Sequence, residues 1–276
     1  MQETDTPVTT IRRTLAAVLA AAVLLSGCSA GGDAESASDN PEATSSVSTP
    51  VEGPTTKAPN KGRFATALAF TRLVHVGKYS RAASMVEADS PAARYIAHQV
   101  ADTKAYQIDG RGVSGEEDEP TIDGDEKTGK ILIEPTGDSA AYTWKQFAYD
   151  DAGKIRAWTG ASGPVGSVLW TRESRDSGLG VSARLVSAYR TNAGSMEMVV
   201  EFAAKRDVQL SYGASYSPRG GYRQNATDQC SQNELDKGEQ TLCFYTFEDA
   251  KFKGTLRLKV ASAKGYQTAN LVLAIR

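Results

Sequence analysis

The spacing of apolar residues divides the chain beyond residue 60 into a helical part followed by an extended part. Asn60 can cap a first helix, in which apolar side chains recur every three or four residues until Gly77 interrupts the pattern. A second, short helix is expected over residues 79–86. A third is expected to begin where Ser90 can cap the chain and Pro91 can occupy the first helical position.

The two histidines of the chain lie on the first and third of these helices. The third helix is expected to bury a face made of Ala92, Ile96 and Val100. His98 lies about 200° around that helix from Ile96, so it is expected on the solvent face. His75 shares a stripe with apolar residues of the first helix and is expected to point towards the space between the helices and a sheet.

After about residue 105 the apolar period changes to two, which is typical of strands. Extended segments are expected at 106–113, 130–134, 140–149 and 155–160. The last two are joined by Asp-Asp-Ala-Gly at 150–153, whose residue types favour a hairpin turn. Helices followed by an antiparallel sheet predict an α+β domain.

The last part of the chain has the spacing of a β-sandwich. After a polar, glycine-containing connector at 171–180, residues 181–276 hold six short alternating segments. Their number and length predict an all-β immunoglobulin-like sandwich, although the Cys-Trp-Cys pattern of antibody-type domains is absent. The segments are 181–190, 196–202, 208–216, 242–247, 255–260 and 270–275.

Two stretches resemble the nuclear-transport-factor-2-like family. Residues 64–83 are similar to its opening helix, Gly-x-Tyr break and second helix, and residues 147–158 are similar to its late hairpin. The resemblance implies helices on a curved antiparallel sheet over residues 61–170. Similar domains form non-catalytic N-terminal modules of some extracytoplasmic penicillin-binding proteins, whereas enzymes of the family place an Asp, His or Tyr in the cavity. The resemblance therefore implies a candidate pocket lined by His75, Tyr106, Trp144 and Trp158.

The beginning of the chain has the pattern of an export signal. Arg12 and Arg13 precede an uncharged run at 15–25, which is shorter than the about 20 apolar residues that span a bilayer. The following Leu-Ser-Gly-Cys resembles a bacterial lipobox, which implies that 1–27 is a lipoprotein signal peptide and that Cys28 is lipidated and becomes the first mature residue. A freely secreted protein and an uncleaved hydrophobic anchor are the alternatives.

Residues 28–60 have the composition of a disordered tether, with almost no large apolar side chain. A flexible chain of this length has an end-to-end distance of about 30 Å. Its acidic residues outnumber its basic ones, which would repel an anionic bilayer and hold the folded part away from it. The alternative, which we favour, is that this is ordinary linker composition. The tether acids are Asp33, Glu35, Asp39, Glu42 and Glu52.

Charge argues against a nucleic-acid partner. The whole chain has a formal net charge of -2, and neither 61–180 nor 181–276 carries the strong basic excess of a nucleic-acid binder. Cys230 and Cys243 bracket a polar loop, and in an exported protein they are expected to pair, adding about 3 kcal/mol by loop-closure entropy. Two reactive thiols are the alternative.

Strings that imitate catalytic motifs lack their structural context. Residues 110–115 match G-x-G-x-x-G but run into an acidic loop, and 124–130 lack the Ser or Thr that ends a phosphate loop. The acidic run 116–126 lacks the ligand spacing of a calcium loop, and Gly-x-Ser-x-Gly at 27–31 straddles the expected cleavage site. We therefore expect no catalytic residue, no metal and no cofactor.

These observations predict a membrane-anchored extracytoplasmic lipoprotein that acts as a non-catalytic binding or scaffold module of the cell envelope. Its expected partners are the membrane, through the lipid anchor, and an envelope protein or the cell wall; the oligomeric state stays open. The alternative is a small-molecule isomerase or hydrolase that uses the cavity of the first domain, with His75 or a nearby carboxylate as the base.

Overall fold

The computed structural model describes residues 60–111, 119–137, 140–170, 174–191, 194–210 and 213–275. The predicted signal peptide, Cys28 and the tether up to residue 59 lie outside the described residues. Within the described residues, no helix is both long enough and apolar enough to span a membrane. Residues 54–276 belong to one compact unit.

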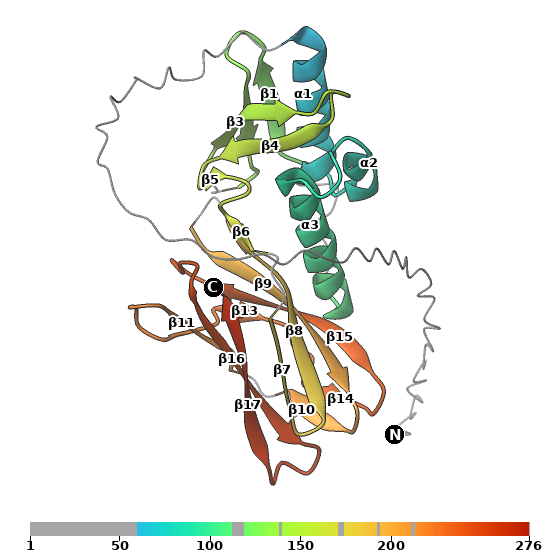
Figure 1. Cartoon of the computed structure of the whole chain (residues 1–276), viewed down its shortest axis with the longest axis vertical. Helices are drawn as coiled ribbons and strands as arrows, with labels where there is room; N and C mark the ends of the chain where they lie inside the picture. The colour runs from blue at the N-terminus through green and yellow to red at the C-terminus, as the bar shows by residue number, and fades with distance from the viewer. Residues whose placement is uncertain are drawn as a thin grey trace, which may run out of the picture. The chain divides into compact units, whose positions relative to one another are not determined.

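Three helices open the described part of the chain (Figure 1). They are α1 (Lys61–His75), α2 (Tyr79–Ser84) and α3 (Pro91–Ile108). The side chain of Asn60 accepts a hydrogen bond from the Gly62 amide at 3.0 Å, and Ser90 Oγ accepts one from the Ala93 amide at 3.1 Å. Both helix starts were therefore predicted correctly, since these side chains satisfy amides that the helix leaves free.

The first sheet is antiparallel, with strands in the order β1-β2-β3-β4-β5. Alternation places Ile131 and Ile133 of β2 on one face, where they are buried in the core shared with the helices, and leaves Leu132 exposed on the other. The predicted segments 130–134 and 155–160 coincide with β2 and β4, and the predicted turn joins β3 to β4. The strands are β1 (Thr121–Asp125), β2 (Lys130–Glu134), β3 (Tyr142–Tyr149), β4 (Ile155–Gly160) and β5 (Gly163–Pro164).

The second sheet has the order β12-β11-β16-β10-β14, with β17 paired to the other side of β16. Leu256, Leu258 and Leu273 are buried on its inner face, together with Tyr216. The strands are β10 (Val208–Leu210), β11 (Ser215–Pro218), β12 (Gln224–Asn225), β14 (Glu234–Leu235), β16 (Gly254–Ser262) and β17 (Thr268–Ile275).

The third sheet has the order β13-β15-β9-β8-β6, with β7 also paired to β8. Its buried side chains, including Phe202 and Phe244, share one hydrophobic core with those of the second sheet. The two sheets therefore form a β-sandwich, as the strand spacing predicted. The strands are β6 (Leu169–Trp170), β7 (Ser174–Gly178), β8 (Val181–Arg190), β9 (Met196–Ala204), β13 (Asp228–Gln229) and β15 (Gln240–Phe247).

The predicted disulfide is confirmed. Cys230 and Cys243 are bonded, with their Cα atoms 5.3 Å apart, and both residues are buried. The bond joins the segment that follows β13 to β15.

The predicted fold class is wrong. Of the residues that can be described, about 46% are strand and 20% helix, arranged with three antiparallel sheets, so residues 61–170 are not a nuclear-transport-factor-2-like helix-on-sheet domain in an α+β fold. The physical reason lies in α3, which contacts β4 of the first sheet but also β8, β9 and β15 of the third. Ala101, Ala105 and Tyr106 of this helix belong to the sandwich core.

The predicted strand at 106–113 is also wrong where the chain is described. Helix α3 continues to Ile108, because Ala105 is buried and Tyr106 stacks on Phe244 at a centroid distance of 4.0 Å. Part of the predicted connector is a strand, since residues 174–178 form β7 against β8. The proposed domain limits stay a prediction.

Candidate functional site

A cluster of packed rings fills the space between the helices and the first sheet. The Trp144 and Trp158 centroids lie 4.7 Å apart, and Phe70 of α1 approaches Trp158 to 5.3 Å. Tyr95 of α3 meets Trp158 edge-on at 5.1 Å and Tyr189 of β8 at 5.2 Å. Edge-to-face pairs at these distances are favourable beyond the area that they bury. The cluster therefore joins the first sheet to the sandwich through α3.

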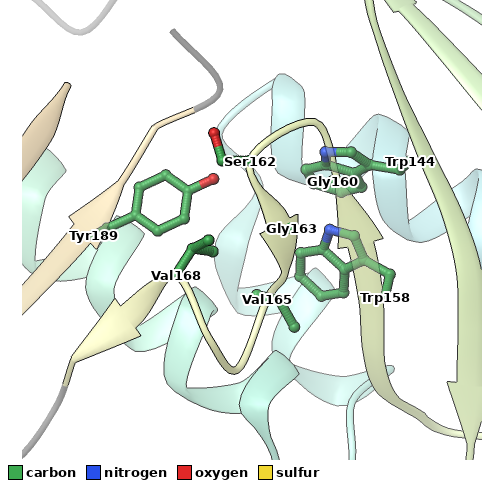
Figure 2. Close-up of a pocket in the computed structure, with 8 residues that line it drawn as sticks. All are labelled: Trp144, Trp158, Gly160, Ser162, Gly163, Val165, Val168 and Tyr189. Atoms are coloured by element: carbon green, nitrogen blue, oxygen red, sulfur yellow. The ribbon is translucent and has the colours of Figure 1, made fainter. Parts of the chain in front are cut away.

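A small pocket opens beside this cluster (Figure 2). Tyr189 enters it from β8, on the side opposite the two indoles, and the loop between β4 and β5 forms its rim. Its free volume is about 10 Å³, which is the space that one water molecule occupies. The lining residues are Trp144, Trp158, Gly160, Ser162, Gly163, Val165, Val168 and Tyr189.

His75 lies at the edge of the ring cluster, with both ring nitrogens in hydrogen-bonding contact. Its Nδ1 is 2.7 Å from the Thr71 carbonyl oxygen, and Nε2 is 2.8 Å from the Tyr142 hydroxyl. Burial lowers the pKa of His75, although the Thr71 carbonyl opposes the shift. In the neutral ring, Nδ1–H donates to that carbonyl and Nε2 accepts from the Tyr142 hydroxyl. The imidazole is thus held in one tautomer and one orientation.

The structure brings together three of the four residues predicted for the pocket. Trp144 and Trp158 line it, and the His75 ring lies 5.0 Å from Trp144 without lining the pocket. Tyr106 lies elsewhere, because it is stacked on Phe244 of the sandwich. The interior beside the first sheet thus holds mainly packed rings, with the polar pair His75 and Tyr142 at its edge.

A second constellation, which the sequence did not reveal, lies where α3 meets β8 and β9. His98 was expected on the surface, but it is only 1% exposed. Its Nδ1 lies 2.8 Å from Ser187 Oγ of β8, and its Nε2 lies 4.0 Å from a carboxylate oxygen of Glu197 on β9. Conversely, Val100 was expected in the core and is 47% exposed.

Burial shifts the pKa of every titratable group in this constellation. It lowers the pKa of His98 to about 3 and raises that of Asp102, one helical turn further on, to about 6. Burial, together with the charge of Asp102, raises the pKa of Glu197 to about 8. Near neutral pH, His98 is therefore an uncharged base, whereas the surroundings of Glu197, whose side chain is 30% exposed, favour its protonated form. The ring of Tyr189 packs against His98 at 5.3 Å.

A signal for this constellation was present in the sequence. The buried residues of α3 include Tyr95, His98 and Ala105 beside the expected Ala92 and Ile96, so they cover a wide arc of the helix. A helix with a single partner buries a narrower stripe. Aromatic and small residues at three- and four-residue spacing on a second face could have indicated that α3 has two partners.

Comparison with known proteins identifies no family. No protein-family profile and no curated protein matches the chain. Among solved structures, the archaellum periplasmic stator protein FlaG from Sulfolobus acidocaldarius matches at 13% identity. The match covers 31% of this chain and 91% of that one, with a TM-score of 0.20. At this TM-score the likeness carries no argument about fold or function.

Proposed function

We propose that the protein is a lipid-anchored lipoprotein on the extracytoplasmic face of the cell membrane, where it acts as a non-catalytic binding or scaffold module of the envelope. The anchor rests on Leu-Ser-Gly-Cys after a short uncharged run. Two acyl chains on Cys28 would hold the protein stably, whereas one chain gives only reversible binding.

The packed interior of the part that contains the first sheet favours a binding module over an enzyme. Small-molecule sites are usually clefts of roughly 300–1,000 Å³. The space between the helices and the first sheet is instead filled by Phe70, Tyr95, Trp144 and Trp158, with about 10 Å³ free beside them. Such an interior supports a rigid body that recognises its partner through its surface.

The sharing of α3 supports the same proposal. One helix packs on both the first sheet and the sandwich, so the two parts present their surfaces in a fixed relation. We further propose that the sandwich is of the immunoglobulin-like kind, which commonly serves recognition at cell surfaces.

Membrane fractionation of cells that produce wild type and Cys28→Ala tests the anchor. We expect wild type in the membrane fraction, and Cys28→Ala as unprocessed precursor or shed protein. Equal membrane retention of processed, lipid-free Cys28→Ala would contradict the anchor. Crosslinking in intact cells followed by purification from membranes then tests the module. Recovery of the same envelope partner with wild type and with His75→Gln supports it.

A further inference from the structure

The second sheet and the loops at one of its ends carry more basic than acidic residues. Its strands contain two basic residues, Arg257 and Lys259 on β16, and one acidic residue, the exposed Glu234 on the edge strand β14. The loops at one end add further basic groups, and the Arg219 amide donates to the Lys253 carbonyl at 2.7 Å, so these two loops adjoin. The whole chain has a net charge of -2, so this face is set apart from its average. The added basic residues are Arg219, Arg223, Lys251 and Lys253, beside the acidic Glu248 and Asp249.

Two of these arginines lie on the outer face of the sheet. Arg223 Nε donates to Ser215 Oγ at 2.8 Å, and Arg257 Nη1 donates to Ser217 Oγ at 3.3 Å. Ser215 and Ser217 are two residues apart on β11, so their side chains share one face. It is the face opposite the sandwich core, because Tyr216 between them belongs to that core; Ser217 is partly exposed there, whereas Ser215 is only 1% exposed.

Both guanidinium groups keep donors available for an anion. Each is held by a serine hydroxyl, and within the part of the chain that the structure describes neither forms an ion pair with a carboxylate. Arg184 on the third sheet shows the contrast, since it bonds Glu201 through both Nε and Nη2 at 2.7 Å. A guanidinium has five N–H donors in a fork that matches phosphate oxygens.

Tyr222 stands at the tip of the loop between β11 and β12, and 94% of its surface is exposed. Arg219 and Arg223 flank the tip. Gly220 has φ +74°, a conformation that glycine adopts without strain, and the Gly221 amide donates to the Pro218 carbonyl at 3.1 Å, so the turn is tight. An exposed tyrosine beside arginines suits the boundary between water and lipid, where its ring and hydroxyl meet different surroundings.

We infer that this basic face docks on an anionic lipid surface. The basic face is the outer surface around Arg223, Arg257 and Lys259, with Arg219 and Tyr222 at its tip. Its arginines would bind lipid phosphates and Tyr222 would enter the headgroup layer. The inference rests on the proposed lipid anchor, because anchoring would raise the effective concentration of the bilayer and a weak attraction would then suffice.

Vesicle binding by the whole chain after the signal peptide, residues 28–276 with Cys28→Ser, tests the inference without the anchor. Sedimentation is measured with vesicles of phosphatidylcholine alone and with about one third phosphatidylglycerol, at about 0.1 M salt. We expect binding only to the anionic vesicles. The double variant Arg223→Gln/Arg257→Gln should lower the partition coefficient about tenfold to thirtyfold. Tyr222→Ser should lower it several-fold without changing its salt dependence.

The matched control is Lys145→Gln/Lys154→Gln, which removes the same charge from exposed positions of the first sheet and its hairpin. It should bind as wild type does, and circular dichroism should show all variants folded. Equal binding to both vesicle types, or an equal loss in the control, would overturn the inference. So would binding to a soluble phosphodiester polymer without binding to vesicles, because the partner would then be a wall polymer. Failure of Cys28 lipidation would overturn only the anchor, since this assay does not use it.

Discussion

The imidazole of His98 on α3 and the hydroxyl of Ser187 on β8 meet at 2.8 Å between Nδ1 and Oγ. Both residues are buried, so the contact is shielded from water. It lies on the side of α3 that faces the sandwich, while Ile96 and Tyr95 pack into the ring cluster of the first sheet. This polar contact therefore helps to set the position of a helix that both parts of the fold share.

Ser187→Ala should lower the free energy of unfolding by about 1–3 kcal/mol, because it leaves a buried imidazole nitrogen without its partner. Urea unfolding followed by circular dichroism measures the loss. Ser177→Ala on the neighbouring β7, where the residue is exposed, is the control and should change stability by less than about 0.5 kcal/mol. Equal stability of the two variants would show that the contact contributes nothing.

Stability should fall between about pH 6.5 and 8 because of Glu197. A carboxyl group whose pKa is raised to about 8 stabilises the folded state fully below its ordinary value of 4.5, and this contribution is lost as the pH rises through 8. The raised pKa of Asp102 lowers the free energy of unfolding mainly between pH 3.8 and 6, so this decrease is nearly complete above its pKa of about 6. His98 is held neutral with a pKa of about 3, so it lowers the free energy of unfolding only as the pH falls below 6.5. Of these three groups, Glu197 therefore makes the main contribution to the change in the free energy of unfolding between pH 6.5 and 8.

Glu197→Gln should flatten the decline between pH 6.5 and 8, since an amide does not titrate. Denaturant midpoints at four or five pH values give the slope for wild type and variant. Glu201→Gln on the same strand is the matched control. A wild-type slope that persists unchanged in Glu197→Gln would show that Glu197 is not the titrating group.

The disulfide should hold the end of α3 as well as the sandwich. Next to Cys230, Asp228 binds Arg111 Nη1 at 2.8 Å, Gln229 accepts from Arg111 Nη2 at 3.0 Å, and Ser231 Oγ donates to Asp109 at 2.7 Å. The Arg111 guanidinium also lies 4.8 Å from the Phe244 ring centroid, directly after Cys243 in the sequence. Four contacts to the end of α3 therefore come from residues beside the bond.

Cys230→Ser/Cys243→Ser should lower the free energy of unfolding by up to about 3 kcal/mol, by loop-closure entropy. It should also speed amide exchange in the last turn of α3, whose partners would be less firmly held, while exchange in β2 stays as in wild type. Exchange measured by mass spectrometry on both segments gives the comparison. Two free thiols in the untreated exported protein would end the claim.

Local patterns predicted the elements that depend on near neighbours. Ile131, Leu132 and Ile133 form a short apolar run bounded by Lys130 and Glu134, and the Asp and Gly residues of 150–153 favour a turn by their own chemistry, so β2 and the β3–β4 hairpin were found. The disulfide between Cys230 and Cys243 could be predicted once the sequence indicated export, because disulfides form in oxidising compartments.

The features that the sequence did not predict depend on contacts between segments that are distant in the chain. His98 faces Ser187 across 89 residues of sequence, and the period of α3 can indicate a second buried face but not that β8 is its partner. Tyr106 begins a run with the composition of a strand, yet its stacking on Phe244 keeps it helical. The ring cluster likewise needs Tyr189 from β8, which closes the space that the sequence had left for a pocket. The fold class was therefore predicted wrongly mainly because the buried face of α3 that packs on the sandwich was expected to be exposed.

His75→Gln separates the binding module from the enzyme alternative. In the module, His75 is a packed residue whose Nδ1 donates to Thr71 and whose Nε2 accepts from Tyr142. Glutamine can make one of these bonds, so we expect a stability loss of about 1–2 kcal/mol. Tyr142→Phe, which removes only the hydroxyl, should lose a similar amount. Any ligand or partner should bind His75→Gln within about tenfold of wild type. A loss of a measured activity by about a hundredfold, with melting unchanged, is the scale for removing a general base and would establish the enzyme instead.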